Sequence, residues 1–151
     1  MDEHMIERWN SVVKPGDHVY HLGDVYMGSG KRFLKKFARL NGKKRLVIGN
    51  HDDLKKKIDD KIRLTDLFEK VMLWRIWKDH GLIMTHVPTH PSTLGEGRMK
   101  TNSGKDVPKM VNVHGHIHTN KSPEGPYFCA CVEQIDYRPI HIDEIKQRIK
   151  K

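Results

Sequence analysis

The sequence predicts a single mixed α/β domain, built as a sandwich, over residues 1–151. Three observations favour this fold class. The length fits one hydrophobic core, and the 36% of hydrophobic residues gather in short runs rather than being spread evenly. Helical and strand-like runs alternate in the first half of the chain, whereas strand-like runs dominate the second half. We find no internal repeat and no low-complexity segment.

The first half predicts three helices and two strands. In chain order these are a helix over 5–13, a strand over 18–22, a helix over 33–40, a strand over 45–48 and a helix over 54–62. The helices are predicted from apolar residues that recur every three or four positions. Pro15-Gly16 and Asn41-Gly42 mark the ends of the first two helices, because both pairs favour turns.

The second half predicts five strands and a last helix. The expected strands cover 71–77, 82–85, 110–113, 127–132 and 140–142, and a short basic helix follows from Asp143. Residues 87–109 are rich in Pro, Gly, Ser, Thr and Lys without periodicity, so we expect a long loop there. Cys129 and Cys131 lie in an apolar run, and we expect buried core cysteines rather than a disulfide or a zinc site.

The chain is basic, with 28 Lys and Arg residues against 19 Asp and Glu and a formal net charge of +9. A positive field suits an anionic partner such as a phosphate ester, a nucleotide or a nucleic acid, although a solvated helix face gives the same composition. No apolar run is long enough to cross a bilayer, and residues 1–20 lack the features of a signal peptide. We therefore expect a cytoplasmic protein with no membrane partner.

Four strand-like runs end in side chains that bind metals or transfer protons. In order they are Asp24; Asn50 and His51; His86; and His114, His116 and His118. Ligands of open α/β sheets bind beyond the carboxyl ends of the strands, so these residues predict one shared site. A carboxylate, an amide oxygen and several imidazoles suit manganese, iron, zinc or nickel.

These segments resemble sequence blocks of the calcineurin-like metallophosphoesterases, and the sequence looks most like small bacterial and phage members. The matching segments are Gly23-Asp24, Gly49-Asn50-His51-Asp52, His86 and Gly115-His116-Ile117-His118, four of the five family blocks in order. The resemblance implies a metallophosphoesterase-like β-sandwich flanked by helices. It also implies hydrolysis of a phosphodiester or phosphomonoester by metal-activated water, with two divalent metal ions in the family.

The resemblance implies a role for each candidate residue. Asp24 would bridge the two ions, His118 would belong to the first ion, and His51 would be the general acid or stabilise the phosphoryl oxygens. Asn50, His86 and His116 would complete the second ion's ligands. For Asp52 two roles stay open, since it could orient His51 or cap the helix that we expect after it.

The sequence departs from the family pattern at the first block, which in the family is D-x-H at the end of a strand. Asp2-Glu3-His4 has these residue types, but no strand precedes it, and we interpret it as the start of a surface helix. We therefore expect the first strand of the fold to be missing and only one ion to be bound. Three explanations compete: an internal start within a longer gene, a second chain that supplies the strand, or a reduced form with one weak metal site.

Two functions other than hydrolysis stay open at this point. One is a catalytically weak or inactive relative that binds nucleotide or nucleic acid. The other is a subunit that pairs with a full-length copy, or a homo-oligomer formed through the exposed sheet edge. The presence of His51 favours the enzyme, whereas the missing first block favours the binding relative.

Overall fold

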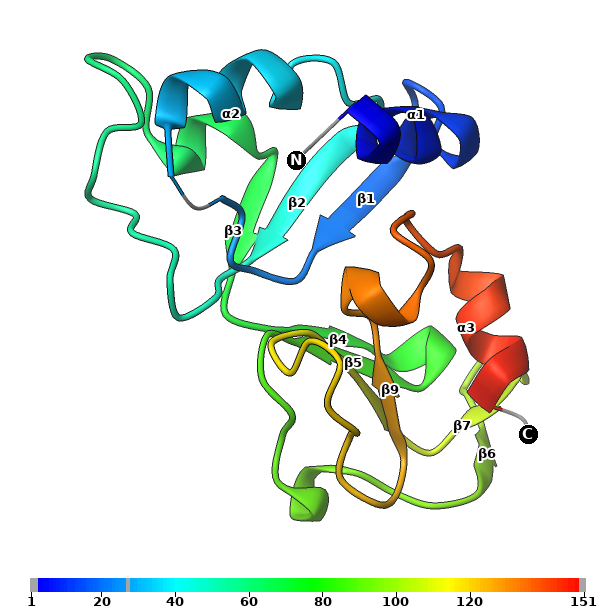
Figure 1. Cartoon of the computed structure of the whole chain (residues 1–151). Helices are drawn as coiled ribbons and strands as arrows, with labels where there is room; N and C mark the ends of the chain where they lie inside the picture. The colour runs from blue at the N-terminus through cyan, green and yellow to red at the C-terminus, as the bar shows by residue number, and fades with distance from the viewer. Residues whose placement is uncertain (1–2, 27, 150–151) are drawn as a thin grey trace.

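Two β-sheets with helices packed against them form the fold (Figure 1). The computed structural model describes residues 3–26 and 28–149. The first sheet is parallel and contains, in spatial order, β1 (His18–His21), β2 (Lys43–Val47) and β3 (Lys70–Met72). The second contains, in order, β4 (Arg75–Trp77), β5 (Leu82–Thr85), β8 (Val111–His114) and β9 (Tyr127–Cys129).

Helices α1 (Glu3–Val12) and α2 (Gly30–Phe37) cover the first sheet. Their apolar faces bury Ile6, Phe33 and Phe37 in one core cluster with Leu46 of β2. Each such buried side chain contributes about 1.5–3 kcal/mol to folding. This core fixes the strands whose carboxyl ends carry the first candidate residues.

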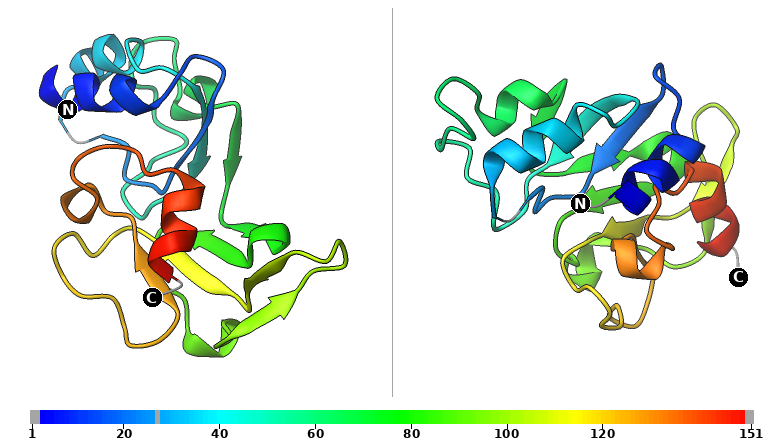
Figure 2. Two further views of the ribbon diagram at one scale, coloured as in Figure 1. Left: turned by 90° about the vertical axis from the view of Figure 1, so that its right-hand side faces the viewer. Right: turned by 45° about the horizontal axis from the view of Figure 1, so that its top comes forward.

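Helix α3 (Ile142–Ile149) packs on the second sheet through Ile145. Strands β5, β8 and β9 are parallel, and β4 is antiparallel at the edge. Tyr20 and Leu22, from β1 and the residues after it, pack against this second core cluster. The two sheets therefore meet near the carboxyl end of β1, and Figure 2 shows the same two-part arrangement from two other sides.

Smaller elements complete the chain. A separate hairpin pairs β6 (Arg98–Lys100) with β7 (Asp106–Pro108). Four 3-10 helices are η1 (Leu64–Leu67), η2 (Lys78–His80), η3 (Pro91–Thr93) and η4 (Val132–Gln134). None of the helices in the described part of the chain has the length and apolar character that crossing a membrane requires.

Most predicted elements are confirmed, including the first two helices, the strands at 18–22, 45–48, 82–85 and 110–113, and the last helix. Glu3 and His4 lie in the first turn of α1, as expected, whereas Asp2 lies outside the described residues. Both cysteines are buried and free. Burial and a hydrogen bond with the Cys129 thiol raise the pKa of Cys131 to about 12.

The helix predicted over 54–62 is wrong, because this segment is irregular. Two aspartates explain the difference. One carboxylate oxygen of Asp53 accepts hydrogen bonds from the backbone N–H of Lys55 and Lys56, and Asp59 does the same for Lys61 and Ile62. Aspartate side chains that bond nearby backbone groups in this way compete with the helix.

Four strand and loop predictions also differ. The strand expected over 127–132 ends at Cys129, and η4 begins at Val132. The run 71–77 is divided between β3 and β4, since its two halves pair with different sheets and the exposed Leu73 and Trp74 connect them. The expected loop 87–109 contains η3 and the β6–β7 hairpin. Residues 140–142 form no strand, because α3 begins at Ile142 and Ile140 packs directly into the second core cluster.

Candidate metal centre

Two glycines bring the loops after β1 and β2 into contact. Gly23 has a φ of 98°, and a Cβ atom there would lie 2.5 Å from the backbone nitrogen of Gly49. A Cβ atom on Gly49 would in turn lie 2.4 Å from the backbone nitrogen of Asp24. Only glycine allows this approach at both positions. The two loops are therefore packed backbone against backbone.

Asp52 ties these two loops together. Its Oδ2 accepts hydrogen bonds from the backbone N–H of Gly49, at 2.7 Å, and of Asp24, at 2.9 Å. Its Oδ1 accepts a third from the N–H of Val25, at 2.9 Å. The structure thus gives Asp52 neither of the roles that the sequence left open. It holds the Asp24 loop in place.

Asp24 is held from the other side as well. Its Oδ1 accepts a hydrogen bond of 2.8 Å from the backbone N–H of His51, which leaves Oδ2 directed toward the junction of the two sheets. Asp24 has a φ of 54°, a conformation that costs free energy for any residue other than glycine, although Asp and Asn tolerate it best. The loop therefore directs this carboxylate at some cost to the folding free energy.

His86, immediately after β5, is the centre of the cluster. Its side chain is 6% exposed, and its Nδ1 lies 2.6 Å from the carbonyl oxygen of Leu22. A carbonyl oxygen can only accept, so Nδ1 donates and carries the proton. With the proton on Nδ1, Nε2 is the nitrogen that faces the junction and is placed to bind a metal through its lone pair.

Three further atoms converge on His86 Nε2. They are Asn50 Oδ1 at 2.7 Å, His116 Nδ1 at 3.1 Å and Asp24 Oδ2 at 3.2 Å. The ligand atoms of Asp24, His86 and His116 all lie within 4.8 Å of one another. Ligands held about 2.1 Å from an octahedral ion are about 3 Å apart along each edge, so this spacing fits one divalent cation.

The loop after β8 places His116 in this cluster. The N–H of Gly115 donates to the carbonyl of His86, at 2.9 Å, and the rings of His86 and His116 meet edge to face with centroids 4.9 Å apart. His116 has a φ of 71°. The four groups thus come from the ends of β1, β2, β5 and β8, which bring together residues spread over 92 positions of sequence, from Asp24 to His116.

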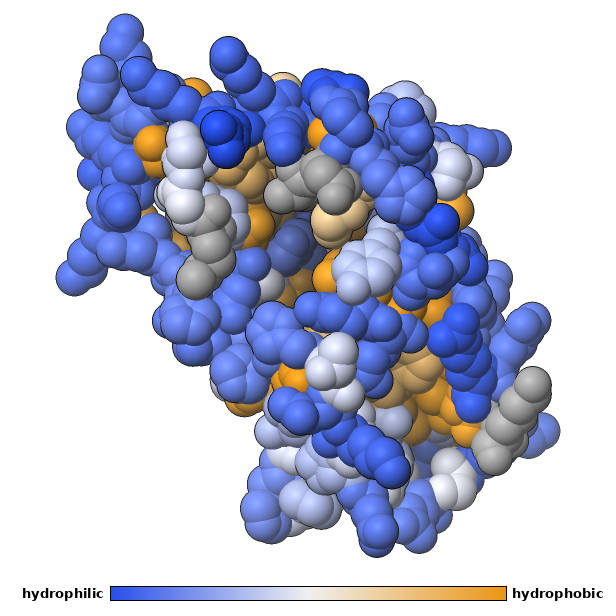
Figure 3. Space-filling view, in the orientation of Figure 1, coloured by the Kyte–Doolittle hydropathy of each residue, from blue (hydrophilic) through white to orange (hydrophobic). Residues whose placement is uncertain are grey.

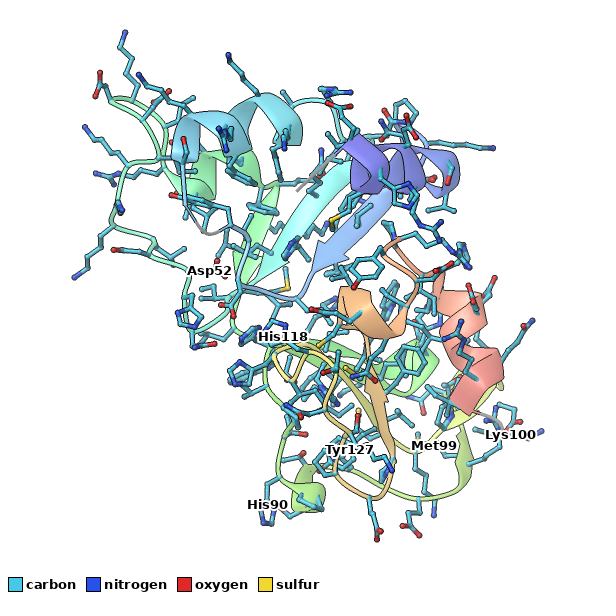
Figure 4. All side chains as sticks on the ribbon, in the orientation of Figure 1. Asp52, His90, Met99, Lys100, His118 and Tyr127 are labelled. Carbon is cyan, nitrogen blue, oxygen red and sulfur yellow. The ribbon has the colours of Figure 1, made fainter. Side chains whose placement is uncertain are left out.

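His118 lies outside the cluster. Its side chain is 74% exposed, and its Nδ1 lies 3.0 Å from Glu133 Oε1. The next residue, Gln134, donates from Nε2 to the backbone carbonyls of His118 and Asn120. Figure 4 shows Asp52 and His118 on opposite sides of the junction between the sheets. The 3-10 helix η4 therefore fixes both the ring and the backbone of the His118 loop.

Two further histidines, His114 and His21, support the loops of the centre. His114 is fully buried, donates from Nδ1 to the carbonyl of Gly115 and contacts Ser122 through Nε2, and burial lowers its pKa. Burial also lowers the pKa of His21, whose Nδ1 accepts from the N–H of Gly23. Both rings act as neutral structural groups that support the loops.

Burial is the largest single influence on the Glu133 carboxyl and raises its pKa, but the hydrogen bond with His118, a backbone hydrogen bond and the charge of His118 together lower it by more, so the net shift is downward. Glu133 therefore stays ionised and anchors the His118 ring. Sequence reasoning missed Glu133 and Gln134, since neither lies in a motif and both contact a residue about fifteen positions away. Asp52 could have been found from its place in the block Gly49-Asn50-His51-Asp52.

The ring of His51 is exposed at the edge of the centre. Its backbone N–H is bound to Asp24, so the residue stays next to the converging ligands while its side chain remains accessible to a substrate. An imidazole side chain is suited to transfer a proton at neutral pH.

Comparison with known proteins agrees with this geometry. A family model described as the calcineurin-like phosphoesterase superfamily domain matches residues 2–126. An uncharacterized protein of Methanocaldococcus jannaschii is 27% identical over 161 residues, which cover 100% of this chain and 76% of that protein. The Gene 66 protein of Mycobacterium phage D29 is 29% identical over 132 residues, or 78% of this chain and 66% of that protein.

A solved structure shares the fold. The crystal structure of a protein of unknown function from Aquifex aeolicus aligns with a TM-score of 0.63 and 26% sequence identity. The alignment covers 96% of this chain and 83% of that one. The similarity therefore extends over both sheets and not only over the loops of the cluster.

Proposed function

Since this chain belongs to the calcineurin-like phosphoesterase superfamily, we propose that it is a metal-dependent hydrolase of phosphodiesters or phosphomonoesters. The observation that supports the proposal is the convergence of three groups on His86 Nε2 at 2.7–3.2 Å. In this proposal Asp24, Asn50, His86 and His116 hold a divalent ion of manganese, iron, zinc or nickel.

The ion and the protein divide the chemistry between them. When bound, a divalent ion polarises the phosphate ester and lowers the pKa of water, so that no protein nucleophile is needed. His86 contributes a fixed Nε2 lone pair, because the carbonyl of Leu22 keeps the proton on Nδ1. His51, held next to Asp24, donates a proton to the leaving alkoxide oxygen.

The number of ions gives a first prediction. The four converging groups account for one ion, while His118 is hydrogen-bonded to Glu133. We therefore expect isothermal titration with Mn²⁺ to show one tight ion per chain. His86→Ala should weaken this binding at least about 10–100-fold, the range known for removal of groups that support a metal site.

His90 provides the matched control, because it is an exposed histidine in the second half of the chain, away from the centre (Figure 4). His90→Ala should leave the affinity for Mn²⁺ unchanged, and His118→Ala should weaken it less than His86→Ala does. Two tight ions per chain, both lost in His118→Ala, would show that His118 is a primary ligand and that the one-ion assignment is wrong.

Hydrolysis is the direct test of the proposed function. The chain should release p-nitrophenol from bis(p-nitrophenyl) phosphate or from p-nitrophenyl phosphate when Mn²⁺ is present. Chelation should stop the reaction and fresh Mn²⁺ should restore it. Tight Mn²⁺ binding without turnover of either ester would instead support the binding relative that lacks catalysis.

A further inference from the structure

The excess of positive over negative charge in the chain comes from one stretch. Residues 28–63 contain thirteen Lys and Arg residues and four Asp residues, a formal charge of +9. The other 115 residues contain fifteen basic and fifteen acidic side chains, so they are neutral overall. The excess charge of the protein therefore belongs to the stretch that contains Asn50, His51 and Asp52. A general solubility effect does not require such a distribution.

Folding gathers much of this charge beside the metal centre. We call α2 and the segment 53–63 together the basic flank. The two parts touch, since a Cβ atom on Gly30 would lie 2.5 Å from the carbonyl oxygen of Ile58. Figure 4 shows them side by side near Asp52, and Figure 3 shows hydrophilic side chains along the outer edge of this part of the face, with some apolar side chains between them.

Three neighbouring lysines of the basic flank, Lys55 to Lys57, form no ion pair with the acids near them in the described residues. The carboxylates of Asp53 and Asp59 accept hydrogen bonds from backbone amides of their own segment. In the part of the chain that the structure describes, no ion pair involves the exposed side chains of Lys55, Lys56 or Lys57. Their charge is available to an external anion.

A cavity lies between α2 of the basic flank and the loop that carries Asp24. Its volume is about 280 Å³, and its lining includes Val25, Tyr26, Arg32 and Lys36. Val25 directly follows Asp24, and its backbone N–H donates to Asp52, so one wall of the cavity belongs to the loop that carries Asp24. The ring of Tyr26 stacks on Phe33 with centroids 4.6 Å apart and planes at 10°. The cavity thus combines cations with a firmly held aromatic ring.

This combination has a recognised use. Sites that bind single-stranded nucleic acids pair a basic groove, which follows the phosphates, with aromatic rings on which bases stack. A small phosphate ester needs only one or two cations, whereas a row of cations on two elements suits a chain of phosphates. We propose that the basic flank binds single-stranded nucleic acid and directs one of its phosphodiesters to the metal centre, an assignment that rests on the proposed function.

Binding is tested separately from hydrolysis by working with chelator present. Fluorescence anisotropy of a labelled single-stranded DNA oligonucleotide should show binding that weakens with salt. In the triple variant Lys55→Ala, Lys56→Ala, Lys57→Ala the affinity at low salt should fall at least tenfold. The slope of log K against log [salt] should become shallower by about 2, because each lost phosphate contact removes about 0.7. The backbone amides that hold this segment are unchanged in that variant.

A second variant tests whether a base of the oligonucleotide stacks on Tyr26. Tyr26→Leu should lower the affinity about tenfold without changing the salt slope, since stacking on an aromatic ring does not depend on counterion release. Circular dichroism should show that both variants are folded. The matched control is Lys100→Ala, Lys105→Ala, Lys109→Ala, which removes the same charge from exposed positions in and after the distant β6–β7 hairpin and should keep wild-type affinity.

The outcomes separate the two proposals. Equal losses in both triple variants, or tighter binding of a phosphopeptide than of the oligonucleotide, would overturn the nucleic-acid assignment. Loss of oligonucleotide binding in the Lys55 to Lys57 triple variant with unchanged hydrolysis of bis(p-nitrophenyl) phosphate would support it. Oligonucleotide binding by a chain that hydrolyses no ester would support the basic flank while refuting the proposed function.

Discussion

The substitution His51→Ala is expected to lower kcat for phosphate ester hydrolysis by about 10²–10⁴-fold, the usual contribution of a general acid. The effect should fall on kcat because the His51 side chain acts on the leaving group. Only the backbone N–H of His51 contacts Asp24, and alanine retains that group. The affinity for Mn²⁺, measured by titration, should therefore stay within a fewfold of wild type.

Asp24→Asn provides the contrast. Asparagine tolerates the φ of 54° at this position, so the loop should keep its shape while the converging oxygen loses its charge. We expect this variant to lose both Mn²⁺ affinity and turnover. Metal loss in His51→Ala as severe as in Asp24→Asn would show that His51 is a ligand and that its assigned role is wrong.

Asp52→Ala is expected to lower the free energy of unfolding by about 2–4 kcal/mol. Three backbone N–H groups lose their acceptor, and each donor left without a partner costs about 1–3 kcal/mol, less where water can replace the carboxylate. Urea unfolding of the metal-free chain, followed by circular dichroism, measures this loss. Mn²⁺ affinity should fall as well, because Asp52 positions the Asp24 loop.

Two further variants test whether the loss of stability is specific to the Asp52 carboxylate. Asp53→Ala removes an exposed carboxylate that bonds only the N–H groups of Lys55 and Lys56, and should cost less than about 1 kcal/mol. Asp52→Asn keeps one acceptor oxygen and should give an intermediate loss. If Asp52→Ala were no less stable than Asp53→Ala, the carboxylate would not be what holds the two loops together.

Local features of the fold follow from the amino-acid sequence alone. The amphipathic periods predict α1 and α2 because side chains three and four positions apart share a helix face. The position of polar residues after apolar runs predicts a site at the strand ends, and the structure brings Asp24, Asn50, His86 and His116 together there. Each of these features depends on residues that are close in the chain.

Only the tertiary structure decided which groups face each other across long separations. The proton position on His86 is set by the carbonyl of Leu22, 64 residues away, and the ring of His118 is directed by Glu133. No local pattern encodes either contact. The run 71–77 is divided between two sheets for a related reason, since its partners β2 and β5 belong to different sheets.

Competition between local and distant interactions explains the wrong helix prediction over 54–62. The apolar positions at 54–62 have a helical period, yet Asp53 and Asp59 bond backbone amides while Ile58 packs against α2. A periodic pattern shows which side chains are apolar. It does not show which backbone N–H groups form hydrogen bonds with side chains instead of within a helix. The sequence thus determined the candidate ligands, whereas the packing of distant loops decided their arrangement, because hydrogen-bond partners are chosen by proximity in space.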